Sequence, residues 1–110
     1  MKESAEKLFE ASMAHITLLH RGSDMTSEKT SRLLREYVQT ADILPAIPND
    51  HISVESKLEL YKILVNALNK WGAEDTSDNR RIAERGRTMA LQFGFTQRAE
   101  EFNQMLRIIP

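Results

Sequence analysis

The sequence predicts an all-α fold, a single-domain antiparallel bundle of four to five helices. Its 110 residues make about one domain, and 41% of them are hydrophobic, which is enough to build one core. Apolar side chains recur at steps of three and four along almost the whole chain, which is the period of amphipathic helices. No stretch alternates apolar and polar residues, and no Asn-Gly or Asp-Gly hairpin signal occurs. Residues 1–110 are therefore expected to form a single helical domain.

Two helices are predicted before the first proline, at about 4–21 and at about 26–43. Gly22 follows the first range, where a glycine can end a helix in the left-handed conformation. Pro45 must end the second helix, and it is expected to push Leu44 toward an extended conformation. The apolar stripe of the second helix consists of Leu33, Leu34, Tyr37, Val38, Ala41 and Leu44.

A third helix is predicted at about 54–71, after a loop at 45–52. The loop has the sequence PAIPNDHI, in which two prolines with an asparagine and an aspartate separate two periodic segments. Ser53 is the expected N-cap of the third helix, because its hydroxyl can accept a bond from a free N–H of the first turn. Trp71, the only tryptophan, falls in the last turn. It can close the end of the core or anchor a partner.

The last two helices are predicted at about 78–93 and at about 97–109. Gly94 stands where a left-handed glycine ends a helix, and Phe95 can supply the hydrophobic contact of that motif. Thr96 is the expected N-cap of the last helix. Short connections of this kind make consecutive helices antiparallel neighbours.

Gly86 lies in the middle of the predicted helix 78–93, where a glycine costs about 1 kcal/mol relative to alanine. A helical wheel places it within the apolar arc of that helix. The other members of the arc are Ile82, Met89, Ala90 and Phe93, with Ala83 at the edge. Such a glycine either lets another helix approach closely or gives a ligand access to the backbone, and the packing interpretation is favoured.

Four arginines, Arg80, Arg81, Arg85 and Arg87, occupy the opposite arc of the same helix together with Glu84. Arginine forms bidentate pairs with carboxylates and phosphates and is enriched in interface hot spots. Three interpretations are open for this face. It can be a solvated face neutralised by Glu84 and by acids on neighbouring helices, a docking surface for an acidic protein, or a surface for nucleic acid.

The alternative hypothesis is a nucleic-acid-binding regulator that uses residues 80–98, with the Arg-rich helix 78–93 as its binding element. Ala90 and Gly94 match the small residue and the turn glycine of a helix-turn-helix motif. The same register, however, puts Glu100 and Asn103 at positions that should be apolar, which counts against the motif. The formal net charge of −1 also differs from the strong positive charge of most non-specific nucleic-acid binders.

The sequence offers little support for an enzyme, a metal site or a cofactor. It has no cysteine and no Gly-x-Ser-x-Gly or Gly-rich phosphate motif. Of the three histidines, His15 and His20 do not share a helix face, and His51 lies in the predicted loop. Every carboxylate falls in a turn or on a polar helix face, except Asp42 at the end of the second predicted helix.

The sequence also suggests a location and a class of partner. We expect a cytoplasmic protein with no membrane segment, because the apolar runs are short and no targeting signal is evident. Two adjacent apolar pairs, Leu18 with Leu19 and Ile108 with Ile109, cannot easily be buried on one helix face, so a homodimer is plausible. The leading hypothesis is a small non-enzymatic domain that binds another protein with an acidic patch. An immunity protein, antiactivator, antitoxin or adaptor would fit it, with Arg80, Arg81, Arg85, Arg87 and Trp71 as partner-binding residues.

Overall fold

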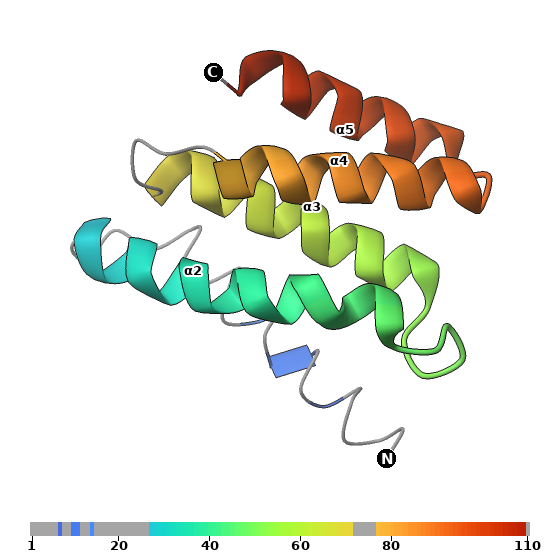
Figure 1. Cartoon of the computed structure of the whole chain (residues 1–110), viewed down its shortest axis with the longest axis horizontal. Helices are drawn as coiled ribbons and strands as arrows, with labels where there is room; N and C mark the ends of the chain where they lie inside the picture. The colour runs from blue at the N-terminus through green and yellow to red at the C-terminus, as the bar shows by residue number, and fades with distance from the viewer. Residues whose placement is uncertain (1–6, 8–9, 12–13, 15–26, 72–76, 110) are drawn as a thin grey trace.

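A computed structural model of the chain describes residues 7, 10–11, 14, 27–71 and 77–109. The described part contains four α-helices and one short 3-10 helix, and no strand. The elements are α2 (Ser27–Ile43), η1 (Leu44–Ala46), α3 (Val54–Trp71), α4 (Ser77–Gln92) and α5 (Thr96–Ile108). The predicted all-α fold is thus confirmed (Figure 1).

The predicted and observed ranges of these four helices differ by at most one residue at either end. Of the helix predicted at 4–21, the structure describes residues 7, 10, 11 and 14, all of which are helical, and the rest lies outside the described residues.

Contacts between helices fix their relative directions. The Asn79 side-chain amide, near the start of α4, donates to Asn69 Oδ1 near the end of α3 over 2.8 Å, so α3 and α4 are antiparallel. Arg35 in α2 binds Asp78 at the start of α4, and Asp42 near the end of α2 binds Arg85 further along α4. The helices α2 and α4 therefore run in the same direction and end at the same end of the bundle (Figure 1).

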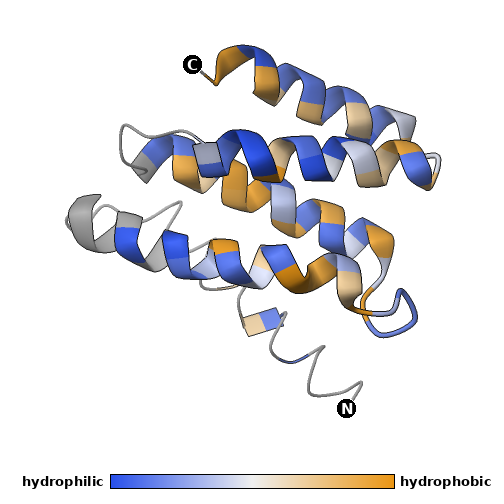
Figure 2. Ribbon diagram, in the orientation of Figure 1, coloured by the Kyte–Doolittle hydropathy of each residue, from blue (hydrophilic) through white to orange (hydrophobic). Residues whose placement is uncertain are grey.

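The core is centred on α3, which packs against both α2 and α4, while α5 packs mainly on α4. Buried residues cover about half of the circumference of α3, because neighbouring helices pack on more than one side of it. The apolar ones are Leu58, Leu60, Tyr61, Leu64, Val65, Ala67 and Leu68. The other helices bury a single stripe each and present polar faces to solvent (Figure 2).

The end of α2 differs in one detail from the prediction. Pro45 does end the helix, but Leu44 is not the extended residue expected before a proline. The chain instead tightens into η1, with the Ile47 N–H donating to the Leu44 carbonyl over 3.1 Å. Leu44 is thereby buried in the core, and the first extended residue is Ile47.

The start of α3 is capped as predicted. The Ser56 N–H donates to Ser53 Oγ over 3.1 Å, which satisfies one of the free N–H groups of the first turn. One turn later the buried Lys57 ammonium reaches back to the loop, where it donates to the Ile47 carbonyl and to Asn49 Oδ1. Burial lowers the pKa of Lys57. The loop before α3 is therefore tied to the helix at two points.

The turn between α4 and α5 confirms the predicted glycine C-cap. Gly94 has φ +80°, its N–H donates to the Leu91 carbonyl, and the Phe95 N–H donates to the Ala90 carbonyl over 2.8 Å. These two bonds form a Schellman motif. Because α4 ends at Gln92, Phe93 does not continue the apolar arc as predicted and is exposed.

Two further predictions concern α5. Thr96 is the first residue of that helix and not its N-cap, since Phe95 takes the N-cap position without a side-chain cap bond. Gly86, by contrast, confirms the packing interpretation. A Cβ atom at this position would lie 2.5 Å from Cζ of Phe102, so α5 packs its buried phenyl ring directly on the α4 backbone.

Candidate functional site

The four arginines of α4 do not share one surface. Two of them face α5 and make hydrogen bonds there. Arg80 Nη2 donates to the Ile109 carbonyl over 3.1 Å, and Arg87 Nη1 donates to Asn103 Oδ1 over 3.2 Å. Arg80 and Arg87 therefore connect α4 to α5 and to the residue that follows it.

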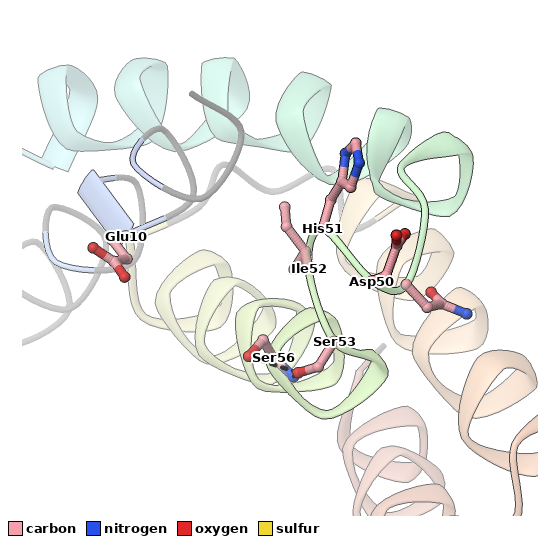
Figure 3. Close-up of a pocket in the computed structure, with 7 residues that line it drawn as sticks. Glu10, Asp50, His51, Ile52, Ser53 and Ser56 are labelled. Carbon is pink, nitrogen blue, oxygen red and sulfur yellow. Dashed lines mark hydrogen bonds between the residues drawn. The ribbon is translucent and has the colours of Figure 1, made fainter. Parts of the chain in front are cut away.

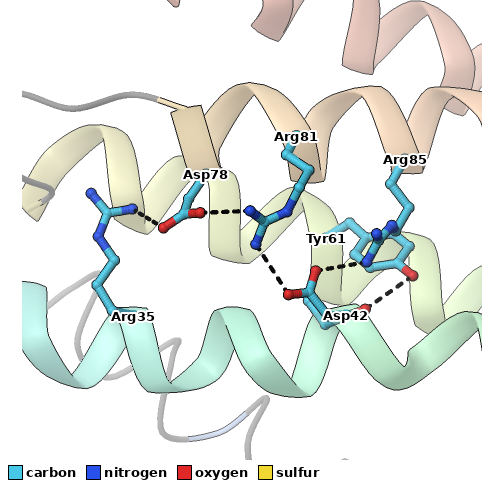
Figure 4. Close-up of polar contacts among 7 residues, drawn as sticks. Arg35, Asp42, Tyr61, Asp78, Arg81 and Arg85 are labelled. Atoms are coloured by element: carbon cyan, nitrogen blue, oxygen red, sulfur yellow. Dashed lines mark hydrogen bonds and ion pairs between the residues drawn. The ribbon is translucent and has the colours of Figure 1, made fainter.

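The other two arginines face α2, where they meet Asp42 (Figure 4). Arg81 Nη2 lies 3.0 Å from Asp42 Oδ2, and Arg85 Nη1 lies 2.7 Å from Asp42 Oδ1. Arg81 also binds Asp78 Oδ1 over 2.9 Å, and Asp78 Oδ2 binds Arg35 of α2 over 3.0 Å. We call these five side chains the α2–α4 charge network. It contains three cations and two anions.

The α2–α4 charge network lies at the surface. The side chains of Arg81, Asp42 and Arg85 are 45%, 37% and 31% exposed. Ion pairs exposed to this degree are screened by water and salt, and each contributes about 0–1 kcal/mol to stability. The network therefore orients the guanidinium groups more than it stabilises the fold.

A tyrosine of α3 lies below this network (Figure 4). The Tyr61 hydroxyl donates to the Ala41 carbonyl at the long distance of 3.5 Å, and its ring is buried in the core. Burial raises the pKa of Tyr61 to about 12, with a smaller lowering effect of Arg85 and a raising effect of Asp42. Tyr61 thus stays neutral, and its hydroxyl lies close to the Asp42 and Arg85 side chains (Figure 4).

A hollow of about 380 Å³ opens beside Arg81 and Arg85, between η1 and the second half of α4. Pro45 and Met89 form its apolar wall. The two arginines and Glu84 provide charged groups, and Thr88 and Gln92 complete the lining. We call this feature the α4 hollow. It offers a small apolar surface directly beside two cations.

Exposed apolar side chains gather at the same end of the bundle. Ile43 is the last residue of α2, Leu91 lies in the last turn of α4, and Phe93 follows the end of α4, and all three are exposed. Large apolar side chains left in water near a hollow are typical of a binding surface.

The sequence also named five residues outside α4. Trp71 ends α3, but its side chain lies outside the described part, as do Leu18 and Leu19. The structure separates the adjacent pair Ile108 and Ile109, which the sequence analysis expected to be difficult to bury together. Ile109 is 4% exposed and belongs to the core, because the chain leaves α5 in an extended conformation, whereas Ile108 is 73% exposed. A dimer contact at this end would therefore use Ile108 alone.

Two other hollows lie in the described part of the chain, one before α3 and one at the start of α5. One, of about 370 Å³, is lined by polar residues of the loop before α3, including His51, and by Glu10 (Figure 3). In Figure 3 the Ser53 and Ser56 hydroxyls bond each other and do not approach the imidazole of His51. The other hollow lies at the start of α5, beside Glu101. Glu101 Oε2 has no hydrogen-bond partner, but it pairs with Lys62 over 3.3 Å.

Among the described residues, no serine hydroxyl that lines the first hollow is hydrogen-bonded to His51. Within the described ranges, no group of three or more histidine, cysteine or acidic side chains is placed to hold a metal ion. None of the described helices is both long and apolar enough to cross a membrane. Comparison of the chain with models of protein families, with curated proteins and with solved structures found no match.

Sequence reasoning named Arg81 and Arg85 but did not name Asp42 as the residue that binds them. A signal was present, because Asp42 is the one carboxylate that the helical wheel did not place on a polar face. It directly follows the buried Ala41 and so lies at the edge of the apolar stripe of α2. An acid at such an edge is positioned to meet a cation on the neighbouring helix.

Proposed function

We propose that the chain is a small non-enzymatic domain that regulates another protein by binding it. An immunity protein, an antiactivator, an antitoxin or an adaptor would work in this way. The binding surface we propose is the end of the bundle where α2 and α4 finish, including the α4 hollow. The observation that carries the proposal is that two arginines line the α4 hollow, while three exposed apolar side chains lie at or just after the ends of α2 and α4.

This composition resembles the centre of a protein interface more than it resembles a catalytic pocket. Interfaces combine apolar contact area with a few oriented charged groups, and arginine is among the residues that contribute most to binding. The α4 hollow is open, and its charged lining residues are two arginines and Glu84. A docking role uses these features, whereas catalysis would require a shielded acid, base or nucleophile.

The alternative of a nucleic-acid regulator is less well supported. All four arginines of α4 already donate to acceptors within the chain, and acidic side chains lie among them. A phosphate backbone would have to displace these acceptors and would be repelled by the acids. A salt-dependent affinity for nucleic acid is the result that would favour this alternative over a protein partner.

The proposal is tested by affinity capture of the tagged chain from cells that produce it, followed by titration of the purified partner. We expect one stoichiometric protein and no hydrolase or transferase activity. The variants Arg81→Gln and Arg85→Gln should each weaken the complex roughly tenfold, as expected for an interface arginine worth about 1–2 kcal/mol.

The variant Arg98→Gln is the matched control. Arg98 pairs with Glu59 between α5 and α3 at similar exposure, so its replacement should leave the affinity unchanged. Absence of any protein partner would contradict the proposal. Affinity for DNA or RNA that falls steeply with salt would favour the nucleic-acid alternative instead.

A further inference from the structure

We infer that Asp42 occupies a binding site for a carboxylate of the partner. An acidic side chain of the partner displaces Asp42 and binds Arg81 and Arg85. The α4 hollow then receives an adjacent apolar side chain of the partner. This inference rests on the proposed function and names the chemistry of the partner segment. It also makes Asp42 an internal competitor for the binding site.

The first argument is the geometry of the contact with Asp42. Each of its two carboxylate oxygens is bound by a different guanidinium, at 3.0 Å from Arg81 and at 2.7 Å from Arg85. Two guanidinium groups held at this spacing form a receptor for one carboxylate, because each oxygen receives its own charge-assisted hydrogen bond. The receptor is already formed in the free protein, since Asp42 holds both guanidinium groups there.

The second argument is that the contact is exchangeable. All three side chains are between 31% and 45% exposed, so water and salt weaken their attraction. A partner surface that covers the site would exclude that water and strengthen the same type of bond. An incoming carboxylate can therefore replace Asp42, which itself returns to solvent.

The third argument is that the exchange conserves charge. One carboxylate of the partner replaces one carboxylate, Asp42, between the same two guanidinium groups, so no charge is left uncompensated. Beside it, the apolar wall of Pro45 and Met89 can accept one apolar side chain. Glu84 is the only acid that lines the α4 hollow, and it can receive an N–H or a lysine of the partner. The segment that fits is one in which an acidic and an apolar residue are neighbours on one surface.

The test uses a synthetic peptide made of glutamate and leucine pairs, and a matched peptide with glutamine in place of glutamate. Binding to the full chain is followed by NMR, through the side-chain Nε–H signals of Arg81 and Arg85 and the methyl signal of Met89. We expect these signals to shift with the glutamate peptide and not with the glutamine peptide. The variant Asp42→Asn should bind the glutamate peptide about two- to fivefold more tightly, because a weak internal competitor is removed.

Glu59→Gln is the matched control, since it removes the same charge from an ion pair of similar length and exposure on another side of the bundle. Its affinity for the peptide should equal that of the unmodified chain. If Asp42→Asn and Asp42→Ser both bind the peptide no more tightly than Glu59→Gln does, or if neither shows saturable binding, the inference is wrong. The second variant, Asp42→Ser, is needed because the amide oxygen of an asparagine can still accept a hydrogen bond from one guanidinium group, which the shorter serine side chain does not reach.

The backbone amide spectrum of each variant shows whether the fold is retained. Arg85→Gln gives an independent reading, since it should weaken peptide binding even if the variants at Asp42 lose part of α2. Failure of this inference differs from failure of the proposed function. A protein partner whose affinity does not depend on Asp42 would remove the exchange of carboxylates but would leave the binding role in place.

Discussion

Replacement of Gly86 by alanine tests the close contact between α4 and α5. An alanine Cβ would lie 2.5, 2.6 and 2.9 Å from three ring carbons of Phe102, whereas carbon atoms pack at about 3.5–4.0 Å. The ring is fully buried, so it must shift by about 1 Å against its neighbours. Overpacking of this kind costs about 1–3 kcal/mol, and the gain in helix propensity returns about 1 kcal/mol. We expect a net loss of about 0–2 kcal/mol.

The assay is urea unfolding followed by circular dichroism, carried out on Gly86→Ala in two backgrounds. In the Phe102→Leu background the facing ring is absent, so the same change should be neutral or should stabilise the protein by up to about 1 kcal/mol. The resulting coupling energy of about 1–3 kcal/mol would assign the cost of overpacking to this one contact. If Gly86→Ala stabilises the unmodified chain by the full helix-propensity gain, the close approach of α5 is wrong.

Three further predictions follow from polar contacts and are checked by the free energy of unfolding. Tyr61 has a pKa near 12 in the folded chain and near 10 when unfolded, so the unfolded state loses its proton first and stability falls between pH 10 and pH 12. The loss should be about 2–3 kcal/mol, and Tyr61→Phe should remove that part of the pH dependence, while an unchanged pH profile would contradict the burial of the hydroxyl. Ser53→Ala should cost about 1 kcal/mol through loss of the bond to the Ser56 N–H, and a cost near zero would show that the cap is not formed. Asp42→Asn should lower stability by less than about 1 kcal/mol at low salt, a difference that shrinks in 1 M salt, whereas a larger loss would show that the network is structural.

Local signals in the sequence predicted the helices well because each has a cause within a few residues. Ser53 begins α3, Pro45 ends α2 and Gly94 ends α4, and all three act through their own backbone or side-chain chemistry. The packing role of Gly86 could also be predicted, since a glycine within the apolar arc of a helix indicates that a neighbouring helix approaches closely. The errors at Phe93 and Thr96 are shifts of one residue at helix ends, where the periodic pattern carries least information.

The candidate site could be predicted only in part. A helical wheel shows that Arg81 and Arg87 are both away from the core, but it does not show which neighbour each one meets. That depends on the packing of α2 on one side of α4 and of α5 on the other. The contact between Asp42 and Arg85 joins residues 43 positions apart, and no local pattern encodes it. The α4 hollow likewise exists only once η1 lies against α4.

Photo-crosslinking in the cell tests the proposed binding surface most directly. Benzoylphenylalanine is placed at Thr88 or Gln92, which are exposed and line the α4 hollow, and at Gln104 on the exposed face of α5 as a control. Illumination should join the chain to one protein from the first two positions and not from the third. Equal crosslinking from all three positions, or none from Thr88 and Gln92, would show that the partner does not bind at this end of the bundle.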